Sequence, residues 1–184
     1  MKPEPILKHR VEPIIIRPFG EADFSVLRQF VGVLRQAFVE SEQPYRDHDH
    51  PVSERFNRWY VNDPDFAVGL HRDPRFVARA SKIFGRSLKP SYCIASMYGP
   101  EGVCPAHTDR PQCQYTIDLL LDGGIDWPLY IEGLPYRLSP GEAICYSGTG
   151  QRHWRLPMRD ECAARHADLM FFHFVPSEWR GSLA

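Results

Sequence analysis

Two hydrophobic periods divide the chain. Between residues 21 and 38, apolar side chains recur every three or four positions, which predicts an amphipathic helix of about five turns that packs on a core. A second helix is expected to begin at Asp73-Pro74, where aspartate suits the N-cap and proline suits the first helical position, and to end at Gly85. From residue 91 onward the period falls to two, which is typical of short half-buried strands.

The predicted strands are short, regularly spaced and separated by turn residues. They cover 92–98, 115–121, 127–132, 136–138, 143–146 and 167–175, and one further β-type run, 11–17, precedes the first helix. This pattern favours a mainly β fold, an antiparallel double-sheet barrel with helices that buttress one sheet. We predict a single domain over 1–184, in which 1–90 supplies helical N-terminal support and 91–176 forms the barrel core.

Composition narrows the classes of function. The 184 residues are 43% hydrophobic, and 22 Lys and Arg nearly balance 23 Asp and Glu, giving a formal charge of −1. This balance argues against a nucleic acid or an acidic membrane as partner. No apolar run is long enough to span a membrane, and the first residues lack the apolar region of a signal peptide. The five cysteines have no CxxC spacing, so we expect free thiols and a cytoplasmic location.

The chemistry of the sequence is concentrated around His107 and Asp109. At period two these residues point to the same face, so an imidazole nitrogen and a carboxylate oxygen can reach one point. A third ligand is expected at His153, farther along the chain. Two histidines and one carboxylate form the facial triad that holds non-haem Fe(II) in oxygenases. Each residue alone could instead be a packed or hydrogen-bonded core residue, and their combination with a barrel pattern is what favours a metal site.

A second histidine pair belongs to a polar stretch. His48 and His50 could also bind a metal, but their surroundings predict a solvated loop near a substrate entrance. Residues 40–72 match no motif and are expected to supply a substrate lid.

Further residues around the triad complete a pattern. They are Tyr98-Gly99, Gly102 and Pro105 before His107-Thr108-Asp109, and the turn Ser139-Pro140-Gly141 before the strand that precedes His153. With these, the region 91–176 resembles the double-stranded β-helix, or jelly-roll, core of Fe(II)/2-oxoglutarate-dependent dioxygenases, in particular their prolyl-4-hydroxylase-like branch.

The resemblance implies an enzyme that hydroxylates or otherwise oxidises an organic substrate with O2 and 2-oxoglutarate, and releases succinate and CO2. It implies that His107, Asp109 and His153 hold Fe(II), which binds the co-substrate and O2. It also implies residues that bind 2-oxoglutarate: Arg165 as the anchor of the distal carboxylate with Arg155 and Arg152 as competitors, and Tyr115 as a second donor with Tyr98 as the alternative.

The sequence leaves the substrate open. A small molecule and a peptide are both compatible with it. The alternative function is a cupin-type metal-binding protein that does not turn over 2-oxoglutarate.

Overall fold

The computed structural model describes residues 10–42, 56, 58–100, 102–123, 126–158 and 166–183. This part of the chain forms three α-helices, one 3₁₀ turn and ten strands. The helical elements are α1 (Glu21–Glu40), α2 (Asp65–His71), α3 (Pro74–Phe84) and η1 (Pro111–Cys113). The strands are β1 (Ile14–Ile16), β2 (Arg58–Asn62), β3 (Leu88–Tyr98), β4 (Cys104–His107), β5 (Tyr115–Gly123), β6 (Leu129–Ile131), β7 (Leu134–Tyr136), β8 (Ala143–Tyr146), β9 (His153–Arg155) and β10 (Ala167–Pro176).

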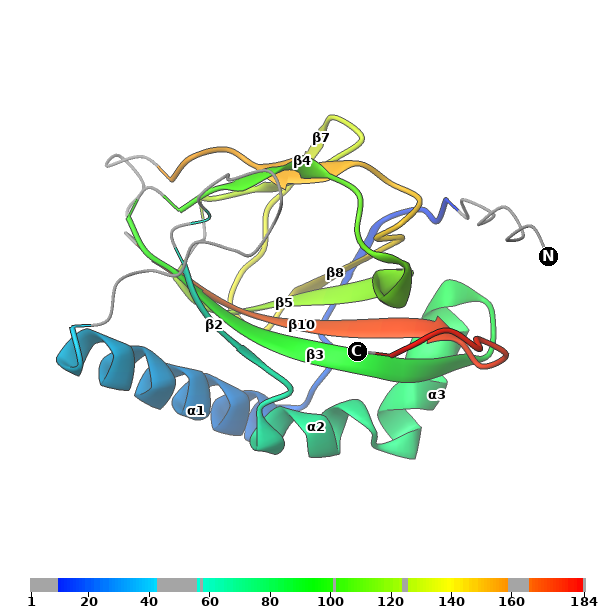
Figure 1. Ribbon diagram of the computed structural model, residues 1–184, viewed down its shortest axis with the longest axis horizontal. Coiled ribbons are helices and arrows are strands. Elements are labelled where there is room, and N and C mark those ends of the chain that lie inside the picture. The colour runs from blue at the N-terminus through cyan, green and yellow to red at the C-terminus, as the bar shows by residue number, and fades with distance from the viewer. Residues whose placement is uncertain are drawn as a thin grey trace.

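The strands form two antiparallel sheets. The larger sheet has the order β1-β8-β5-β10-β3-β2, and the smaller sheet has the order β4-β9-β6-β7. In Figure 1 the smaller sheet lies above the larger one, and the helices lie below it. The expectation of a mainly β, antiparallel fold with helices against one sheet is therefore confirmed.

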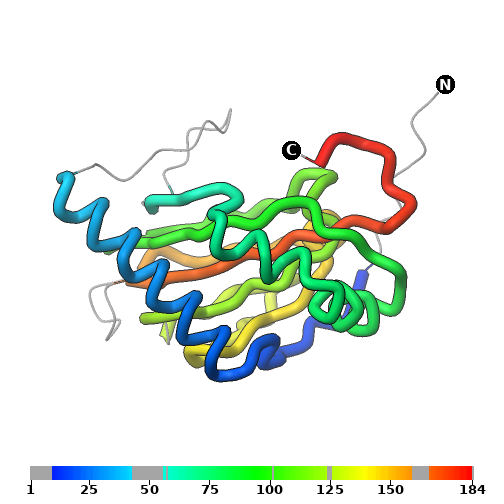
Figure 2. The backbone as a smooth tube through the Cα atoms, turned by 90° about the horizontal axis from the view of Figure 1, so that it is seen from below, coloured from blue at the N-terminus to red at the C-terminus, as the bar shows by residue number. Residues whose placement is uncertain are grey.

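The three helices cover the outer face of the larger sheet, and Figure 2 shows them lying across its strands. The helix predicted over 21–38 is confirmed and ends two residues later, at Glu40. The second predicted helix is confirmed as α3. Its N-cap Asp73 accepts a hydrogen bond from the Arg75 backbone N–H, and its C-cap Gly85 has φ of 67°, which favours glycine.

Alternation along β5 separates two cores. Tyr115, Ile117 and Leu119 face the helices, where they join a cluster with the apolar faces of α1, α2 and α3. Leu120 belongs to a second cluster that the two sheets enclose. Because side chains alternate along a strand, Thr116 and Asp118 point to this enclosed side as well. Both polar side chains are fully buried.

The region predicted as a substrate lid differs from expectation. Within 40–72, β2 pairs with β3 at the edge of the larger sheet, and α2 packs beneath that sheet. These segments are part of the framework because Trp59 and Ala67 are buried in the helix-side core and Phe66, Val68 and Leu70 pack against it. His48 and His50 lie outside the described residues.

Several other boundaries also shift. The run predicted over 11–17 is shortened to β1, and the short strands β4 and β9 were not predicted. Because β3 begins at Leu88, the predicted border at residue 90 lies within a strand. The single-domain assignment stays a prediction. Among the helices described, none is both long and apolar enough to cross a membrane. The four cysteines in the described part are free thiols, as predicted.

Candidate metal centre

His107, Asp109 and His153 come together where β4 and β9 pair. His107 is the last residue of β4, and it lies directly opposite His153, the first residue of β9. Asp109 follows β4, and its Oδ1 lies 3.3 Å from His107 Nε2 and 3.5 Å from His153 Nε2. The three possible ligand atoms all lie within 4.8 Å of one another. The structure thus brings together the three residues predicted as iron ligands.

Backbone carbonyls orient both imidazoles. His107 Nδ1 lies 2.6 Å from the carbonyl oxygen of Pro105, and His153 Nδ1 lies 3.0 Å from that of Gln151. A carbonyl oxygen only accepts, so Nδ1 carries the proton in each ring. When a ring is neutral, as it is when it binds a metal, its lone pair is therefore on Nε2, the nitrogen that points toward Asp109. Metal-bound histidines are held by this kind of outer hydrogen bond.

A chain of hydrogen bonds holds the second carboxylate oxygen. Thr116 Oγ1 donates to Asp109 Oδ2 over 3.3 Å and lies 3.1 Å from His173 Nδ1. Because Thr116 has one proton to give, His173 must donate to Thr116 while Thr116 donates to Asp109. Oδ1 remains directed at the two histidines. Burial lowers the pKa of His173 to about 4, so His173 is neutral at pH 7.

Close packing against Gly148 fixes the backbone and carboxylate of Asp109. The Asp109 N–H donates to the Gly148 carbonyl oxygen over 2.9 Å. A Cβ atom at Gly148 would lie 2.2 Å from Asp109 Oδ2 and 2.2 Å from the carbonyl oxygen of Cys113. Glycine is therefore required here for close approach.

The carboxylate controls the charge of the site. Although burial raises the pKa of Asp109, attraction to His153 and hydrogen bonds from both histidines hold it well below its usual value. Burial lowers the pKa of His107, but the interactions with Asp109 and Cys104 together outweigh this effect and raise the pKa to about 11. The pKa of His153 is also raised, because Asp109 outweighs the effect of burial. The same negative charge that stabilises a proton on Nε2 would stabilise a divalent cation there.

The enclosed side of the larger sheet also holds a buried ion pair. Arg155 Nη2 donates to Asp118 Oδ2 over 2.8 Å, and its Nη1 donates to the Trp127 carbonyl oxygen over 2.7 Å. Within the described part of the chain, Asp118 Oδ1 is buried and has no hydrogen-bond partner. Tyr98 lies nearby, with its ring edge-on to Trp127 at 4.8 Å between centroids, and its hydroxyl accepts from Arg58 Nη1 over 3.2 Å.

Of the residues predicted to bind 2-oxoglutarate, Tyr115 lies away from the metal centre and Arg165 is not described. Tyr115 points to the helix side of the larger sheet, where its ring lies 4.9 Å from that of Phe84 and its hydroxyl accepts from Arg86 over 3.2 Å. The structure does not bring it to the metal centre. Arg165 lies outside the described residues.

Sequence reasoning missed several residues of the site: Arg58, Thr116, Asp118, Gly148 and His173. Thr116 and Asp118 could have been found, because they alternate with Tyr115 on a predicted strand and are polar in an apolar run. His173 gave a similar signal in the last strand. Nothing in the sequence marked Arg58 or Gly148.

A second cluster of possible ligands lies at the other end of β5. Asp122, His166 and Asp168 place ligand atoms within 4.8 Å of one another. Arg28 and Arg35, however, already form ion pairs with Asp122 and Asp168. Two arginines beside these carboxylates oppose a divalent cation, so this cluster suits a metal less well than the first.

No family model and no curated protein sequence matches the chain. Solved structures do match it. The epimerase SnoN from nogalamycin biosynthesis, in complex with Fe3+, alpha-ketoglutarate and nogalamycin RO, is 10% identical with a TM-score of 0.66, over 90% of this chain and 79% of that one. An oxidoreductase of the 2OG-Fe(II) oxygenase family from Burkholderia pseudomallei is 14% identical with a TM-score of 0.63, over 92% and 86%.

A prolyl-4-hydroxylase from Pseudomonas putida is 16% identical with a TM-score of 0.60, over 92% of this chain and 93% of that one. Identities this low establish the fold alone. The chain therefore has the fold of the 2-oxoglutarate- and Fe(II)-dependent oxygenases, prolyl-4-hydroxylases among them.

Proposed function

We propose that the chain is an Fe(II)- and 2-oxoglutarate-dependent dioxygenase that hydroxylates, or otherwise oxidises, a small-molecule or peptide substrate. The observation that carries the proposal is the convergence of two Nε2 atoms and one carboxylate oxygen within 4.8 Å at the paired strands β4 and β9. Two histidines and one carboxylate suit Fe(II) in oxygenases. The relatives of known fold, one of which holds Fe3+ and alpha-ketoglutarate, support the same class.

The path of the chain between the two sheets supports a double-stranded β-helix. After β3 in the larger sheet, the chain passes to β4 in the smaller sheet, returns to β5, crosses again to β6 and β7, and continues through β8, β9 and β10 in alternate sheets. This winding places the end of β4 and the start of β9 next to each other, and the candidate ligands lie there.

The residues present fit an iron ion. Each histidine has Nδ1 engaged with a carbonyl, and Asp109 has Oδ2 engaged with Thr116, so that one atom of each residue remains for a metal. Fe(II) at this place, with 2-oxoglutarate and O2, would supply oxidation of the substrate, coupled to conversion of 2-oxoglutarate to succinate and CO2. The chain itself orients the ligands and limits access of water. His153 is almost fully buried, whereas the His107 side chain is 33% exposed, so substrate would approach from the side of His107.

The buried side of the barrel offers cations for the distal carboxylate of 2-oxoglutarate. We place this carboxylate near Arg155 and Tyr98, because an arginine binds a carboxylate with two parallel hydrogen bonds. Asp118 already pairs with Arg155, and burial, the largest effect on it, raises the pKa of Asp118. A protonated Asp118 would offer its unpartnered Oδ1 side as a hydrogen-bond donor. Arg165 is the alternative anchor.

The test is an anaerobic titration of the full chain with Fe(II) and 2-oxoglutarate, followed by the visible charge-transfer band of the chelate. We expect the band in the unmodified protein and its loss in His107→Ala and His153→Ala, because two remaining ligands hold the ion weakly. His166→Ala is the matched control, since it removes a histidine from the other cluster. Titrations of Arg155→Gln and Arg165→Gln then identify the anchor as the arginine whose loss weakens 2-oxoglutarate.

Admission of O2 and measurement of succinate by NMR complete this test. Metal binding without the band or succinate would favour the cupin-type alternative. A band that survives in both histidine variants would contradict the assignment of the metal site.

A further inference from the structure

An arginine without a carboxylate partner lies beside the metal centre. Arg110 directly follows Asp109 and is solvent-exposed. Its Nη2 donates to the Tyr92 hydroxyl over 2.6 Å, and its guanidinium lies 5.2 Å from the centre of the Tyr92 ring. Among the residues that the structure describes, none with a carboxylate forms an ion pair with Arg110. By contrast, Arg86 and Arg155 are both paired with acidic residues.

The neighbours of Arg110 do not neutralise it. The Tyr92 hydroxyl, which accepts from Arg110, lies 2.8 Å from Cys113 Sγ. A thiol and a phenol ordinarily have pKa values of about 8.5 and about 10. Both groups are therefore uncharged at pH 7, and the positive charge of Arg110 is not compensated by the groups that it touches.

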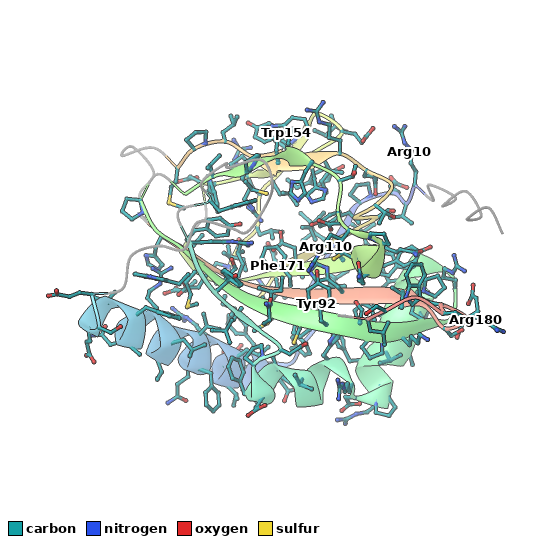
Figure 3. All side chains as sticks on the ribbon, viewed as in Figure 1. Arg10, Tyr92, Arg110, Trp154, Phe171 and Arg180 are labelled. Atoms are coloured by element: carbon teal, nitrogen blue, oxygen red, sulfur yellow. The ribbon has the colours of Figure 1, made fainter. Side chains whose placement is uncertain are left out.

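Contacts link this cation to the metal centre and to an aromatic surface. Cys113 Sγ lies within 4.8 Å of a carboxylate oxygen of Asp109 and of a ring nitrogen of His173. The His173 ring lies 4.9 Å from that of Tyr92 and 6.2 Å from the parallel ring of Phe171, between centroids. Figure 3 labels Arg110, Tyr92 and Phe171, and Phe171 lies on β10, the strand that pairs with β3, which carries Tyr92. Phe171 is partly exposed.

Backbone hydrogen bonds fix the segment that carries Arg110. The Arg110 carbonyl oxygen accepts from the Cys113 N–H over 2.9 Å, which closes the turn η1. One residue before Cys113, the Gln112 carbonyl oxygen accepts from Ser91 Oγ over 2.7 Å. A charged group held in advance loses little conformational freedom when it binds a ligand.

We propose that the substrate is an organic acid whose carboxylate binds Arg110 while its apolar part lies against Phe171. Guanidinium pairs with carboxylate through charge and through matched hydrogen-bond geometry. This inference rests on the proposed function, since it names the substrate class of the same site. Arg110 is then a specificity-determining residue that holds the substrate beside the metal. The binding of 2-oxoglutarate does not depend on Arg110.

The experiment compares a matched pair of probes, 3-phenylpropionate and its uncharged amide, 3-phenylpropionamide. Their binding to the full chain without added metal is measured by saturation-transfer-difference NMR at pH 7. We expect the unmodified protein to bind the carboxylate more tightly than the amide. In Arg110→Gln the affinity for the carboxylate should fall by about tenfold, while the affinity for the amide stays the same. Arg180→Gln, which removes an exposed arginine near the C-terminal end, should leave both affinities as they are.

A second measurement separates this inference from the proposed function. The Fe(II)–2-oxoglutarate band should form in Arg110→Gln at the same 2-oxoglutarate concentration as in the unmodified protein. If the band is normal and the unmodified protein binds the carboxylate and the amide equally well, the inference is overturned and the proposed function stands. Weakened 2-oxoglutarate in Arg110→Gln would also overturn it, because Arg110 would then bind the co-substrate. Absence of the band in every protein would refute the proposed function, whatever the probes show.

Discussion

The two oxygens of Asp109 have different partners, and this difference orients the carboxylate. Oδ1 faces the two histidines, whereas Oδ2 accepts from Thr116, which in turn accepts from His173. An outer residue of this kind contributes to metal affinity without touching the metal.

Thr116→Val removes the donor to Oδ2 and keeps the shape of the side chain. We expect metal affinity to fall by roughly tenfold or more, because the freed carboxylate can rotate away from the site. Thr116→Ser keeps the hydroxyl and should restore most of the affinity. Anaerobic equilibrium dialysis with Fe(II) is the measurement. Equal affinities in Thr116→Val and the unmodified protein would show that Thr116 does not position the carboxylate.

A substitution at Gly148 is a second, steric test of whether the position of the Asp109 carboxylate controls metal binding. The Cβ atom introduced by Gly148→Ala would collide with Asp109 Oδ2 and with a backbone oxygen, both at 2.2 Å, and the backbone oxygen has little freedom to move. We expect the carboxylate to be displaced and Fe(II) affinity to fall by at least about tenfold, since outer changes cost this much without removing a ligand. Gly69→Ala in α2 is the matched control, because its Cβ meets no atom within 4 Å. Normal metal binding in Gly148→Ala would mean that the loop rearranges at little cost.

At the level of elements, length decided what the sequence could predict. Helix α1 spans 20 residues and β10 spans 10, so their periods repeat often enough to be recognised. Strands β4 and β9 have four and three residues, too few to establish a period. Their pairing places His107 opposite His153, and only the motif spacing indicated this from the sequence. Strand β2 was missed because the stretch around it is polar and its partner lies far along the chain.

Alternation within an element explains which site residues were found. The strand β5 was predicted, but Tyr115 was chosen for its phenol, and it points to the helices. The adjacent Thr116 points to the metal centre and was not chosen. Thr116 and His173 stood out in the sequence only as polar residues in apolar strands, and hydrogen-bond relays of neutral residues have no characteristic sequence spacing. Their roles beside Asp109 therefore emerged only from the structure. His107 and Asp109 form a short motif, and His153 follows the Pro-Gly turn and strand of the same pattern, so these three residues could be predicted.

At the scale of the whole molecule, buried histidines couple stability to pH. His71 lies beneath the larger sheet, and its Nε2 is 3.0 Å from the His173 carbonyl oxygen. Burial, the largest cause, lowers the pKa of His71 to about 3 from a usual 6.5. Between these values the unfolded chain binds a proton that the folded chain does not. The contribution of the neutral His71 to the free energy of unfolding is therefore fully present above pH 6.5 and is lost as pH falls toward 3.

We expect His71→Gln, which keeps a donor for the carbonyl and cannot titrate, to reduce this loss. The slope of unfolding free energy between pH 6 and pH 4 should fall by up to about 1.4 kcal/mol per pH unit, the value for one proton. Urea unfolding at several pH values measures it. If the plots of unfolding free energy against pH are parallel for the variant and the unmodified protein, His71 titrates alike in the folded and unfolded states.

The central claim is that His107, Asp109 and His153 hold one metal ion. Anomalous X-ray scattering at the iron edge, from crystals grown anaerobically with Fe(II), tests it most directly. We predict one strong peak about 2.0–2.2 Å from His107 Nε2, His153 Nε2 and Asp109 Oδ1, as is usual for nitrogen and oxygen ligands of such ions. A peak at Asp122, His166 and Asp168 instead, or no peak between β4 and β9, would contradict the account.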